Sequence, residues 1–187
     1  MIQTSIRRLL ENHPIIPVVS LTSMDEIPGV MSQLRDQGIS CIELTLRTPI
    51  AFDVLRELKL NYGKDFDIGV GTLINAEQLH EVKAIGVDFI VSPGLTPYLF
   101  DDLKASGIPF IQGVCTPSEV MLGLNMGLDT FKFFPAEVAG GKDMLKNFNA
   151  IFPTVKFCPT GGITETNYQS YLDLPNVMSV GGSWVTK

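Results

Sequence analysis

Short apolar runs alternate with longer amphipathic ones along the whole chain. Eight of the short runs are rich in Val, Ile and Phe and are bounded by Gly, Pro or Thr, a pattern that predicts strands buried on both faces. The predicted strands are Ile15–Leu21, Cys41–Arg47, Asp67–Leu73, Phe89–Gly94, Phe110–Cys115, Thr130–Pro135, Lys156–Thr160 and Val177–Ser183. Their first residues recur every 20 to 26 residues, so each repeat has room for one strand, a turn and one helix.

Residues typical of helix ends lie between these predicted strands. Ser23–Glu26 and Thr116–Glu119 each carry a hydroxyl residue followed three positions later by a glutamate, which is the pattern of a capping box at a helix N-terminus. Four glycines follow helical runs, as glycines at helix C-termini do: Gly38, Gly86, Gly107 and Gly127. These ends predict a regular alternation of strand and helix through the chain.

Eight such units predict one domain, residues 1–187, folded as an α/β protein of the (β/α)8 TIM-barrel class. An open, doubly wound sheet is the alternative, but it usually has fewer strands and a clear switch point in the strand order. Met1–Asn12 predicts a helix ahead of the first strand. The chain continues only as Trp184–Lys187 after the eighth strand, so the last of the eight helices is expected to be missing.

The amino-acid composition and charge limit the kinds of molecule that the protein is expected to bind. Hydrophobic residues make up 45% of the chain, which indicates a packed globular core, and the formal net charge is −6 with no run of like charges. This distribution argues against nucleic acid and against an anionic membrane surface as partners. No apolar stretch approaches the roughly 20 residues of a membrane span. The N-terminal segment, with Arg7, Arg8 and Glu11, does not have the pattern of a signal peptide.

Cysteines and histidines give no sign of a metal site. Cys41, Cys115 and Cys158 are odd in number, far apart and placed in apolar runs, so we interpret them as structural thiols in a reducing compartment such as the cytoplasm. His13 and His80 share no ligand spacing with each other or with the cysteines. We therefore expect no metal site built by the protein.

The second predicted strand carries polar residues on one of its two faces. Side chains alternate between the faces of a strand, and four residues share the face that is not apolar: Cys41, Glu43, Thr45 and Arg47. A carboxylate and a guanidinium facing inward are costly unless they are paired or functional, and a structural ion pair that closes the barrel is the simpler interpretation. On the third strand, the same alternation places Thr72 with Ile68 and Val70.

Lys132 stands in a strand that is otherwise almost wholly apolar. Burial disfavours the charged form of an amine, and a neutral amine is a nucleophile that forms an imine with a carbonyl substrate. A lysine with a packed stem and a solvated head is the structural alternative. In the functional interpretation Lys132 supplies the amine and Glu43 moves protons, while Arg47 and Thr72 hold a substrate carboxylate. Lys156 opens its strand and is expected at the opposite end of the barrel.

The last two predicted strands end in glycine-rich segments, Pro159–Gly162 and Gly181–Ser183. Barrel enzymes frequently bind phosphate at these two positions through exposed backbone N–H groups. Either pair of glycines alone is equally well explained as a turn. Both together indicate a site for phosphate or for a second carboxylate.

Six segments, taken in order, resemble the motifs of one known family: Ile42–Thr48, Gly69–Thr72, Ser92–Gly94, Phe131–Ala136, Pro159–Gly162 and Gly181–Trp184. Over essentially its whole length the chain resembles the 2-keto-3-deoxy-6-phosphogluconate (KDPG) / 4-hydroxy-2-oxoglutarate (KHG) aldolase family. The resemblance implies a class I, Schiff-base aldolase that acts on a small 2-keto acid, uses no metal or organic cofactor and assembles as a homotrimer. The implied products are pyruvate with glyceraldehyde 3-phosphate, or pyruvate with glyoxylate.

The resemblance also implies a role for individual residues. Lys132 aligns with the imine-forming lysine, and Glu43 with the general acid and base. Arg47 and Thr72 align with contacts to the pyruvate portion of the substrate. The positions of the pocket walls and of the substrate's far end, including its phosphate, align with Pro93, Phe134, Thr160, Gly161, Gly162, Gly182 and Ser183.

Three alternatives stay open at this stage. Within the aldolases, a 2-keto-3-deoxy-6-phosphogalactonate substrate shares the pyruvate portion and differs elsewhere. A barrel that binds sugar phosphates, with an isomerase or epimerase as its catalytic form, explains the glycine-rich ends but gives Lys132 no covalent role. A non-enzymatic relative is expected to have lost Glu43, Arg47 or Lys132, and all three are present.

Overall fold

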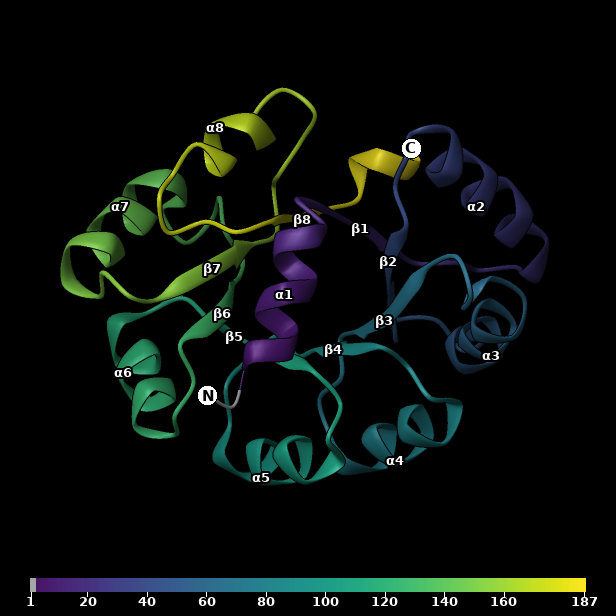
Figure 1. The fold of residues 1–187 in the computed structure, drawn as a ribbon, viewed down its shortest axis with the longest axis horizontal. Coiled ribbons are helices and arrows are strands. Elements are labelled where there is room, and N and C mark those ends of the chain that lie inside the picture. Colours follow the sequence, from purple (N-terminus) through teal and green to yellow (C-terminus); the bar gives the residue numbers. More distant parts are fainter. Residues whose placement is uncertain (1–2) are drawn as a thin grey trace.

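The computed structural model describes residues 3–187 and contains a ring of eight parallel strands with helices around it (Figure 1). The strands are β1 Ile15–Val19, β2 Cys41–Thr45, β3 Asp67–Gly71, β4 Phe89–Val91, β5 Phe110–Val114, β6 Thr130–Phe133, β7 Lys156–Pro159 and β8 Val180–Gly182. Their order in the sheet is β7-β6-β5-β4-β3-β2-β1-β8. Two isolated bridges, Phe157 to Val177 and Thr160 to Gly181, join the two ends. The predicted (β/α)8 barrel is confirmed.

Helices connect the successive strands on the outside of the ring (Figure 1). They are α2 Ile27–Asp36, α3 Ala51–Tyr62, α4 Ala76–Ile85, α5 Pro97–Ser106, α6 Pro117–Asn125, α7 Gly141–Ile151 and α8 Tyr168–Leu172, with α1 Thr4–Asn12 ahead of β1. Two short 3-10 turns complete the elements, η1 Met24–Glu26 before α2 and η2 Trp184–Thr186 after β8. Within residues 3–187, β8 is therefore followed by a 3-10 turn and not by an α-helix. None of the described helices is both long enough and apolar enough to cross a bilayer.

Seven of the eight strands begin where the sequence predicts, and all eight end earlier. The predicted first residue is correct for β1 to β7, whereas β8 begins at Val180 and not at Val177. Every strand ends before its predicted last residue; β2, for example, ends at Thr45 and not at Arg47. The apolar pattern continues past the last strand residues because the strand-to-helix loops also pack against the barrel. Those loops carry the candidate site.

The helix-end signals are confirmed at atomic level. In the first capping box the Ser23 N–H donates to Glu26 Oε1 at 2.7 Å, and in the second the Thr116 N–H donates to Glu119 Oε2 at 2.8 Å. The four predicted glycines have left-handed backbone angles, which glycine adopts without the steric cost that other residues incur: Gly38, Gly86, Gly107 and Gly127.

The core has two apolar layers, one on each face of the ring. Ile42 and Leu44 belong to the large layer between the strands and the helices, together with the stacked rings of Phe148 and Phe157. The smaller layer fills the inside of the barrel and consists of Ile6, Leu10, Ile16, Cys41, Phe89, Val91, Ile111 and Cys158. The predicted alternation along β2 is confirmed, because Cys41 faces inward and its neighbour Ile42 faces the helices.

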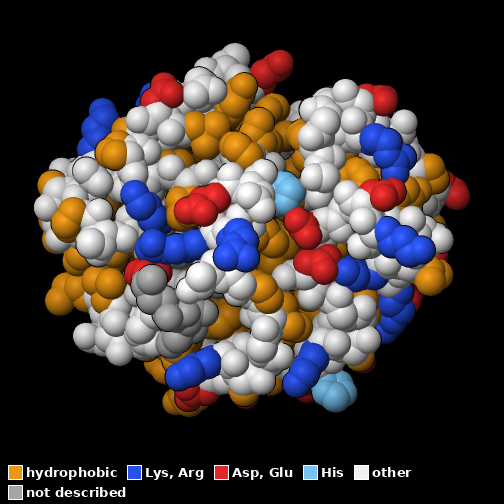
Figure 2. All heavy atoms as spheres, viewed as in Figure 1, with side chains coloured by type: hydrophobic (Ala, Val, Ile, Leu, Met, Phe, Trp, Pro, Cys, Tyr) orange, Lys and Arg blue, Asp and Glu red, His pale blue; other side chains and the backbone are white. Residues whose placement is uncertain are grey.

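Helix α1 closes the amino-terminal end of the barrel (Figure 1). Ile6 and Leu10 enter the inner apolar layer, and Gln3, 2% exposed, bonds to the strand ends through its side-chain amide. Its Nε2 donates to the carbonyl oxygens of Phe110 and Thr130, while its Oε1 accepts from the N–H groups of Asp129 and Thr130. The predicted helix over Met1–Asn12 is thus confirmed from Thr4 onward, and its first two residues lie outside the described chain. Figure 2 shows acidic and basic side chains mixed over this face.

Candidate active site

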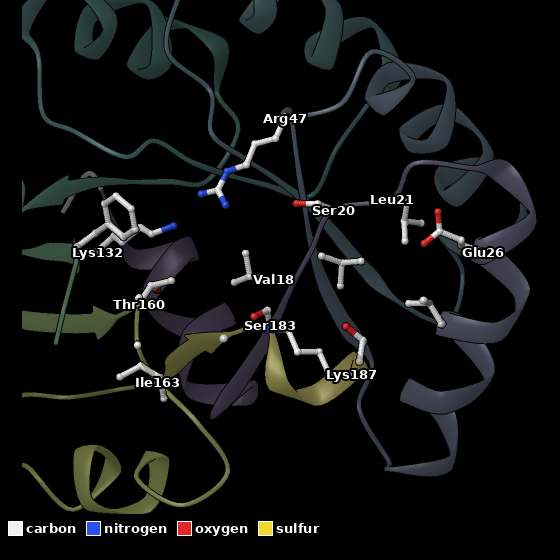
Figure 3. A pocket seen from close by; sticks show the side chains of 17 residues that line it. Val18, Ser20, Leu21, Glu26, Arg47, Lys132, Thr160, Ile163, Ser183 and Lys187 are labelled. Carbon is white, nitrogen blue, oxygen red and sulfur yellow. The ribbon is translucent and has the colours of Figure 1, made fainter. Parts of the chain in front are cut away.

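A cavity of about 430 Å³ opens at the carboxyl-terminal end of the barrel, opposite α1 (Figure 3). The predicted site residues that line it are Lys132, Arg47, Phe134, Thr160, Gly161, Gly162, Gly182 and Ser183. They come from the ends of β2, β6, β7 and β8 and from the loops that follow. In a barrel of parallel strands this is the end where active sites lie, because the strand-to-helix loops converge there.

Lys132 and Glu43 form a buried pair in this end of the barrel. Lys132 Nζ lies 3.2 Å from Glu43 Oε1, and the two side chains are only 5% and 4% exposed. The lysine head is therefore buried against Glu43 and does not extend to the outer surface, so the structural alternative of a head in bulk solvent is wrong. Glu43 makes its ion pair with Lys132 and not with Arg47, so the predicted alternative of a Glu43–Arg47 pair is also wrong. A carboxylate at this distance is placed to take a proton from the amine.

Glycine on the neighbouring strand makes room for the Glu43 carboxylate. A Cβ added at Gly71 would lie 2.0 Å from Glu43 Oε1, the same oxygen that contacts Lys132. Any side chain at position 71 would push the carboxylate away from the amine. Gly71 is thus a geometric requirement of the pair, and the sequence alone showed only a glycine in a strand.

Two uncharged residues, Phe134 and Cys158, also lie near Lys132. The ring of Phe134 lies 5.3 Å from Lys132 Nζ, an arrangement in which an aromatic face stabilises a cation. Cys158 is paired with Lys132 across the β6–β7 ladder, and burial raises the pKa of its thiol to about 11. Because the thiol stays protonated near pH 7, Cys158 does not compete with Glu43 as a proton acceptor.

Arg47 and Thr72 meet at the rim of the cavity. Arg47 Nε donates to Thr72 Oγ1 at 3.2 Å, and the guanidinium is directed into the cavity (Figure 3). No other hydrogen bond or ion pair of this guanidinium is recorded within residues 3–187. Its two terminal nitrogens are thus available for the two parallel bonds that a carboxylate accepts.

The prediction that Thr72 shares a strand face with Ile68 and Val70 is wrong. Ile68 and Val70 pack beneath the helices, and Thr72 would share their face if the strand continued. The strand ends at Gly71, and Thr72 has φ 63°, a left-handed conformation that costs a non-glycine residue on the order of 1–3 kcal/mol. This backbone turn directs the Thr72 hydroxyl to Arg47.

Pro93 follows β4 at the same end of the barrel and is half-buried, but it is not among the residues that line the cavity. Its carbonyl oxygen lies against β5, where a Cβ added at Gly113 would approach it to 2.0 Å. The structure therefore brings Pro93 close to the strand next to β6 without placing it in the cavity wall. Lys156 lies at the other end of its strand, as expected, and its Nζ donates to the carbonyl of Pro175.

The loop after β7 contributes two glycines, Gly161 and Gly162, to the cavity lining. Gly161 and Gly162 have φ angles of 100° and 80°, and within residues 3–187 no acceptor is recorded for either N–H. Glu137 supports the loop from behind, since its N–H donates to the Gly161 carbonyl and a Cβ added at Gly162 would lie 2.5 Å from its Cγ. Glu137 is itself held by the hydroxyl of Tyr171. Such a pair of unpaired N–H groups suits an anion.

Two further hydroxyls face the same region. Thr160 is 6% exposed, and its Oγ1 has no hydrogen-bond partner in the described chain, which is unusual for a buried hydroxyl. Gly181 leaves the space that the Thr160 side chain occupies, because an added Cβ would lie 2.4 Å from Thr160 Oγ1. Ser183 lines the cavity beside Gly182. The polar groups around Gly161 and Gly182 thus form a second polar region of the cavity, apart from Arg47.

Sequence reasoning missed several cavity residues, of which Ser20, Glu26, Thr186 and Lys187 are polar. Glu26 is occupied as a helix cap, accepting bonds from Thr22 and Ser23. Ser20 bonds to Thr45, a residue that sequence analysis placed on the inward face without giving it a role. A single serine after an apolar strand carries no signal of its own. Within residues 3–187 no group of three or more His, Cys, Asp or Glu side chains is arranged to hold a metal ion.

Comparison with protein families gives one match over nearly the whole chain. Residues 6–187 match the family model described as KDPG and KHG aldolase. The KHG/KDPG aldolase of Escherichia coli is 40% identical over 183 residues, which are 98% of this chain and 85% of that protein.

Solved structures resemble the chain in three dimensions. The KDPG aldolase of Legionella pneumophila, with pyruvate captured as a covalent carbinolamine intermediate, has a TM-score of 0.91 and 46% identity, covering 95% of this chain and 86% of that one. The 2-keto-3-deoxy-6-phosphogluconate aldolase of Zymomonas mobilis with 3-phosphoglycerate has a TM-score of 0.92 and 38% identity, covering 98% and 87%.

Proposed function

The chain belongs to the KDPG and KHG aldolase family, and from this we propose that it is a class I aldolase that cleaves KDPG to pyruvate and glyceraldehyde 3-phosphate, KHG to pyruvate and glyoxylate, or both. The observation that carries the proposal is the buried pair of Lys132 and Glu43, 3.2 Å apart at the cavity. An amine with an adjacent proton acceptor is what imine formation requires.

The first half of the reaction joins the substrate to Lys132. Glu43 takes a proton from the Lys132 ammonium, and the neutral amine attacks the C2 carbonyl carbon to give a carbinolamine. Glu43 then returns the proton to the C2 hydroxyl, which leaves as water, and a cationic imine remains on Lys132. The Phe134 ring, 5.3 Å from Nζ, favours this cation.

The second half breaks the bond between C3 and C4. Glu43 takes the proton of the C4 hydroxyl, the C3–C4 electron pair moves toward the imine nitrogen, and the aldehyde leaves. The enamine left on Lys132 is protonated at C3, and addition of water at C2 releases pyruvate and restores the amine. Every proton moves between the substrate, Glu43 and water, so the cycle needs no further reactant.

The two ends of the substrate fit the two polar regions of the cavity. We assign the C1 carboxylate to Arg47, with Thr72 orienting the guanidinium, because Arg47 has unpaired nitrogens at the cavity. We assign the phosphate or second carboxylate to the N–H groups of Gly161 and Gly162, with Thr160, Gly182 and Ser183 alongside. Phe134 then forms one wall of the cavity, and Pro93 lies outside the lining, against β5.

A galactonate-type substrate is the alternative within the aldolases, since it differs from KDPG only at C4. Measuring kcat/KM for cleavage of KDPG, KHG and 2-keto-3-deoxy-6-phosphogalactonate in one preparation ranks the three. We expect KDPG or KHG to be preferred over the galactonate epimer. A preference for the epimer would replace the substrate while leaving the imine mechanism in place.

Borohydride trapping tests the proposed reaction directly. The protein is incubated with pyruvate, reduced with borohydride and analysed by mass spectrometry of the intact chain and of its peptides. We expect one reduced pyruvate adduct per chain, located on Lys132. A folded sample without an adduct would exclude the Schiff-base reaction and would favour the isomerase or epimerase alternative, in which the barrel only binds a sugar phosphate.

Gly71→Ala is expected to lower kcat about a hundredfold, because the new Cβ displaces the Glu43 carboxylate and a shift of about 1 Å in a catalytic group costs about that much. Cleavage is followed by the release of pyruvate. Gly29→Ala is the matched control, since a Cβ added at Gly29 meets nothing within 4 Å. Wild-type turnover in Gly71→Ala would mean that the position of the carboxylate does not limit the reaction.

We also propose that the enzyme works as a homotrimer in the cytoplasm. Helix α6 leaves Met121, Leu122 and Leu124 exposed by 56%, 38% and 37%, an apolar surface that another copy of the chain would cover. The three cysteines are free thiols, which suits a reducing compartment. Light scattering of the purified protein tests the assembly.

A further inference from the structure

Ser20 places a hydroxyl in the cavity that the mechanism above does not use. It is the first residue after β1, its side chain is exposed, and it lines the cavity (Figure 3). Its Oγ lies 2.5 Å from Thr45 Oγ1, and Thr45 is only 1% exposed. One hydroxyl of this pair is thus enclosed by protein and the other faces the substrate space.

The enclosure of Thr45 fixes the direction of the bond between them. Each hydroxyl has one proton to donate and can accept as well. Ser20 is the only recorded partner of the Thr45 hydroxyl within residues 3–187. If Ser20 donated, the Thr45 proton would be buried without an acceptor, which is the costly arrangement. Thr45 therefore donates to Ser20, and the Ser20 proton is left for a group in the cavity.

The order of strands around the ring tells which part of a substrate passes Ser20. Strand β1 lies between β8, which ends at Gly182, and β2, which leads to Arg47. Figure 3 shows the Ser20 oxygen directed into the space that Lys132 enters from the opposite side. A substrate held by Arg47 at its carboxylate and by the glycine loops at its phosphate passes Ser20 with its middle carbons.

We propose that Ser20 is a specificity-determining residue that donates a hydrogen bond to the C5 hydroxyl of KDPG, with Thr45 as the residue that orients it. The inference rests on the proposed function. The other oxygens of KDPG already have partners there: the carboxylate at Arg47, C2 at Lys132, the C4 hydroxyl at Glu43 and the phosphate at the loop of Gly161. The C5 hydroxyl is the oxygen that remains, and it belongs to the middle of the molecule.

Condensation of pyruvate with two aldehydes tests the contact. Glyceraldehyde 3-phosphate carries the hydroxyl that becomes the C5 hydroxyl, and 3-oxopropyl phosphate lacks only that group. A site built to bond a hydroxyl discriminates against the analogue without it. We expect the wild-type ratio of kcat/KM for the two aldehydes to fall about fivefold to tenfold in Ser20→Ala, the loss of one neutral hydrogen bond. Ser32→Ala, an exposed serine on α2, is the matched control and keeps the ratio.

Variants of Thr45 separate orientation from packing. Thr45→Val keeps the shape of the side chain and removes its donor, so it is expected to lower the same ratio, while Thr45→Ser restores it. The double variant Ser20→Ala/Thr45→Val leaves no buried donor without a partner and is expected to match Ser20→Ala, because the two residues act as one unit. If Ser20→Ala alone folds poorly, the ratio of kcat/KM for the two aldehydes is measured in the double variant instead.

Two results would overturn the inference. An unchanged ratio in Ser20→Ala would mean that Ser20 does not contact the C5 hydroxyl. An equal loss for both aldehydes would place the contact on a part that the two products share, such as the carboxylate. Borohydride trapping of pyruvate by the wild-type protein separates these results from a failure of the proposed function, since a trapped adduct on Lys132 preserves the aldolase whatever Ser20 does.

Discussion

Lys132→Ala is expected to abolish aldol cleavage, lowering kcat/KM by a factor on the order of 10⁴ or more, because the covalent nucleophile is removed. Pyruvate release from KDPG, followed with a coupled dehydrogenase, measures the loss. The same variant is expected to give no borohydride adduct with pyruvate. Substantial turnover in Lys132→Ala would contradict the imine mechanism.

Two controls keep that result interpretable. Removing the lysine leaves the Glu43 carboxylate, 4% exposed, without its cation, and an orphaned buried charge of this kind destabilises a fold by about 3–5 kcal/mol. Lys132→Ala/Glu43→Gln removes both charges and is compared with Glu43→Gln alone, so that a further loss of activity in a folded protein reports the missing lysine. Lys156→Ala, at the opposite end of the barrel, is expected to keep wild-type turnover.

Glu43→Gln is expected to lower kcat by about 10²- to 10⁴-fold, the usual contribution of a positioned acid or base. The amide keeps the shape of the side chain but cannot accept the protons that leave Lys132 and the C4 hydroxyl. A second measurement isolates this role: exchange of the pyruvate methyl protons with D2O, followed by NMR, needs the imine and a base but no aldehyde.

We expect Glu43→Gln to slow that exchange as strongly as it slows cleavage. The control is Glu77→Gln, an exposed glutamate in the first turn of α4, for which both rates are expected to match the wild type. Cleavage and exchange at wild-type rates in Glu43→Gln would transfer the proton-moving role to another group and would leave the buried pair with a purely structural function.

The repeating architecture could be predicted from the sequence because each unit is specified locally. The apolar runs fix where β1 to β7 begin, and the capping boxes at Ser23 and Thr116 fix two helix starts. Where the strands end could not be predicted, because the apolar pattern continues into loops that pack on the barrel. At Thr72 this matters, since the left-handed turn after Gly71 replaces the expected alternation.

The residues of the candidate site could also be predicted only in part. Lys132 and Glu43 stand out in the sequence as charges in apolar strands, but they are 89 residues apart, and only closure of the ring brings them together. Gly71 and Ser20 carry no local signal, because their importance comes from the atom that each one faces. Contacts between residues on different strands depend on register and tilt, which single-sequence patterns do not contain.

The packing of α1 against the amino-terminal end of the barrel has a consequence for the order in which the chain folds. Gln3 bonds to Thr130, 127 residues later in the sequence. At translation rates of about 5–20 residues per second, roughly 6–25 s pass between the synthesis of Gln3 and the synthesis of Thr130. During that interval the apolar side chains of Ile6 and Leu10 face water, so the nascent chain presents an amphipathic segment for chaperones to hold. Helix α1 can therefore close the amino-terminal end of the barrel only after most of the strands have been synthesised.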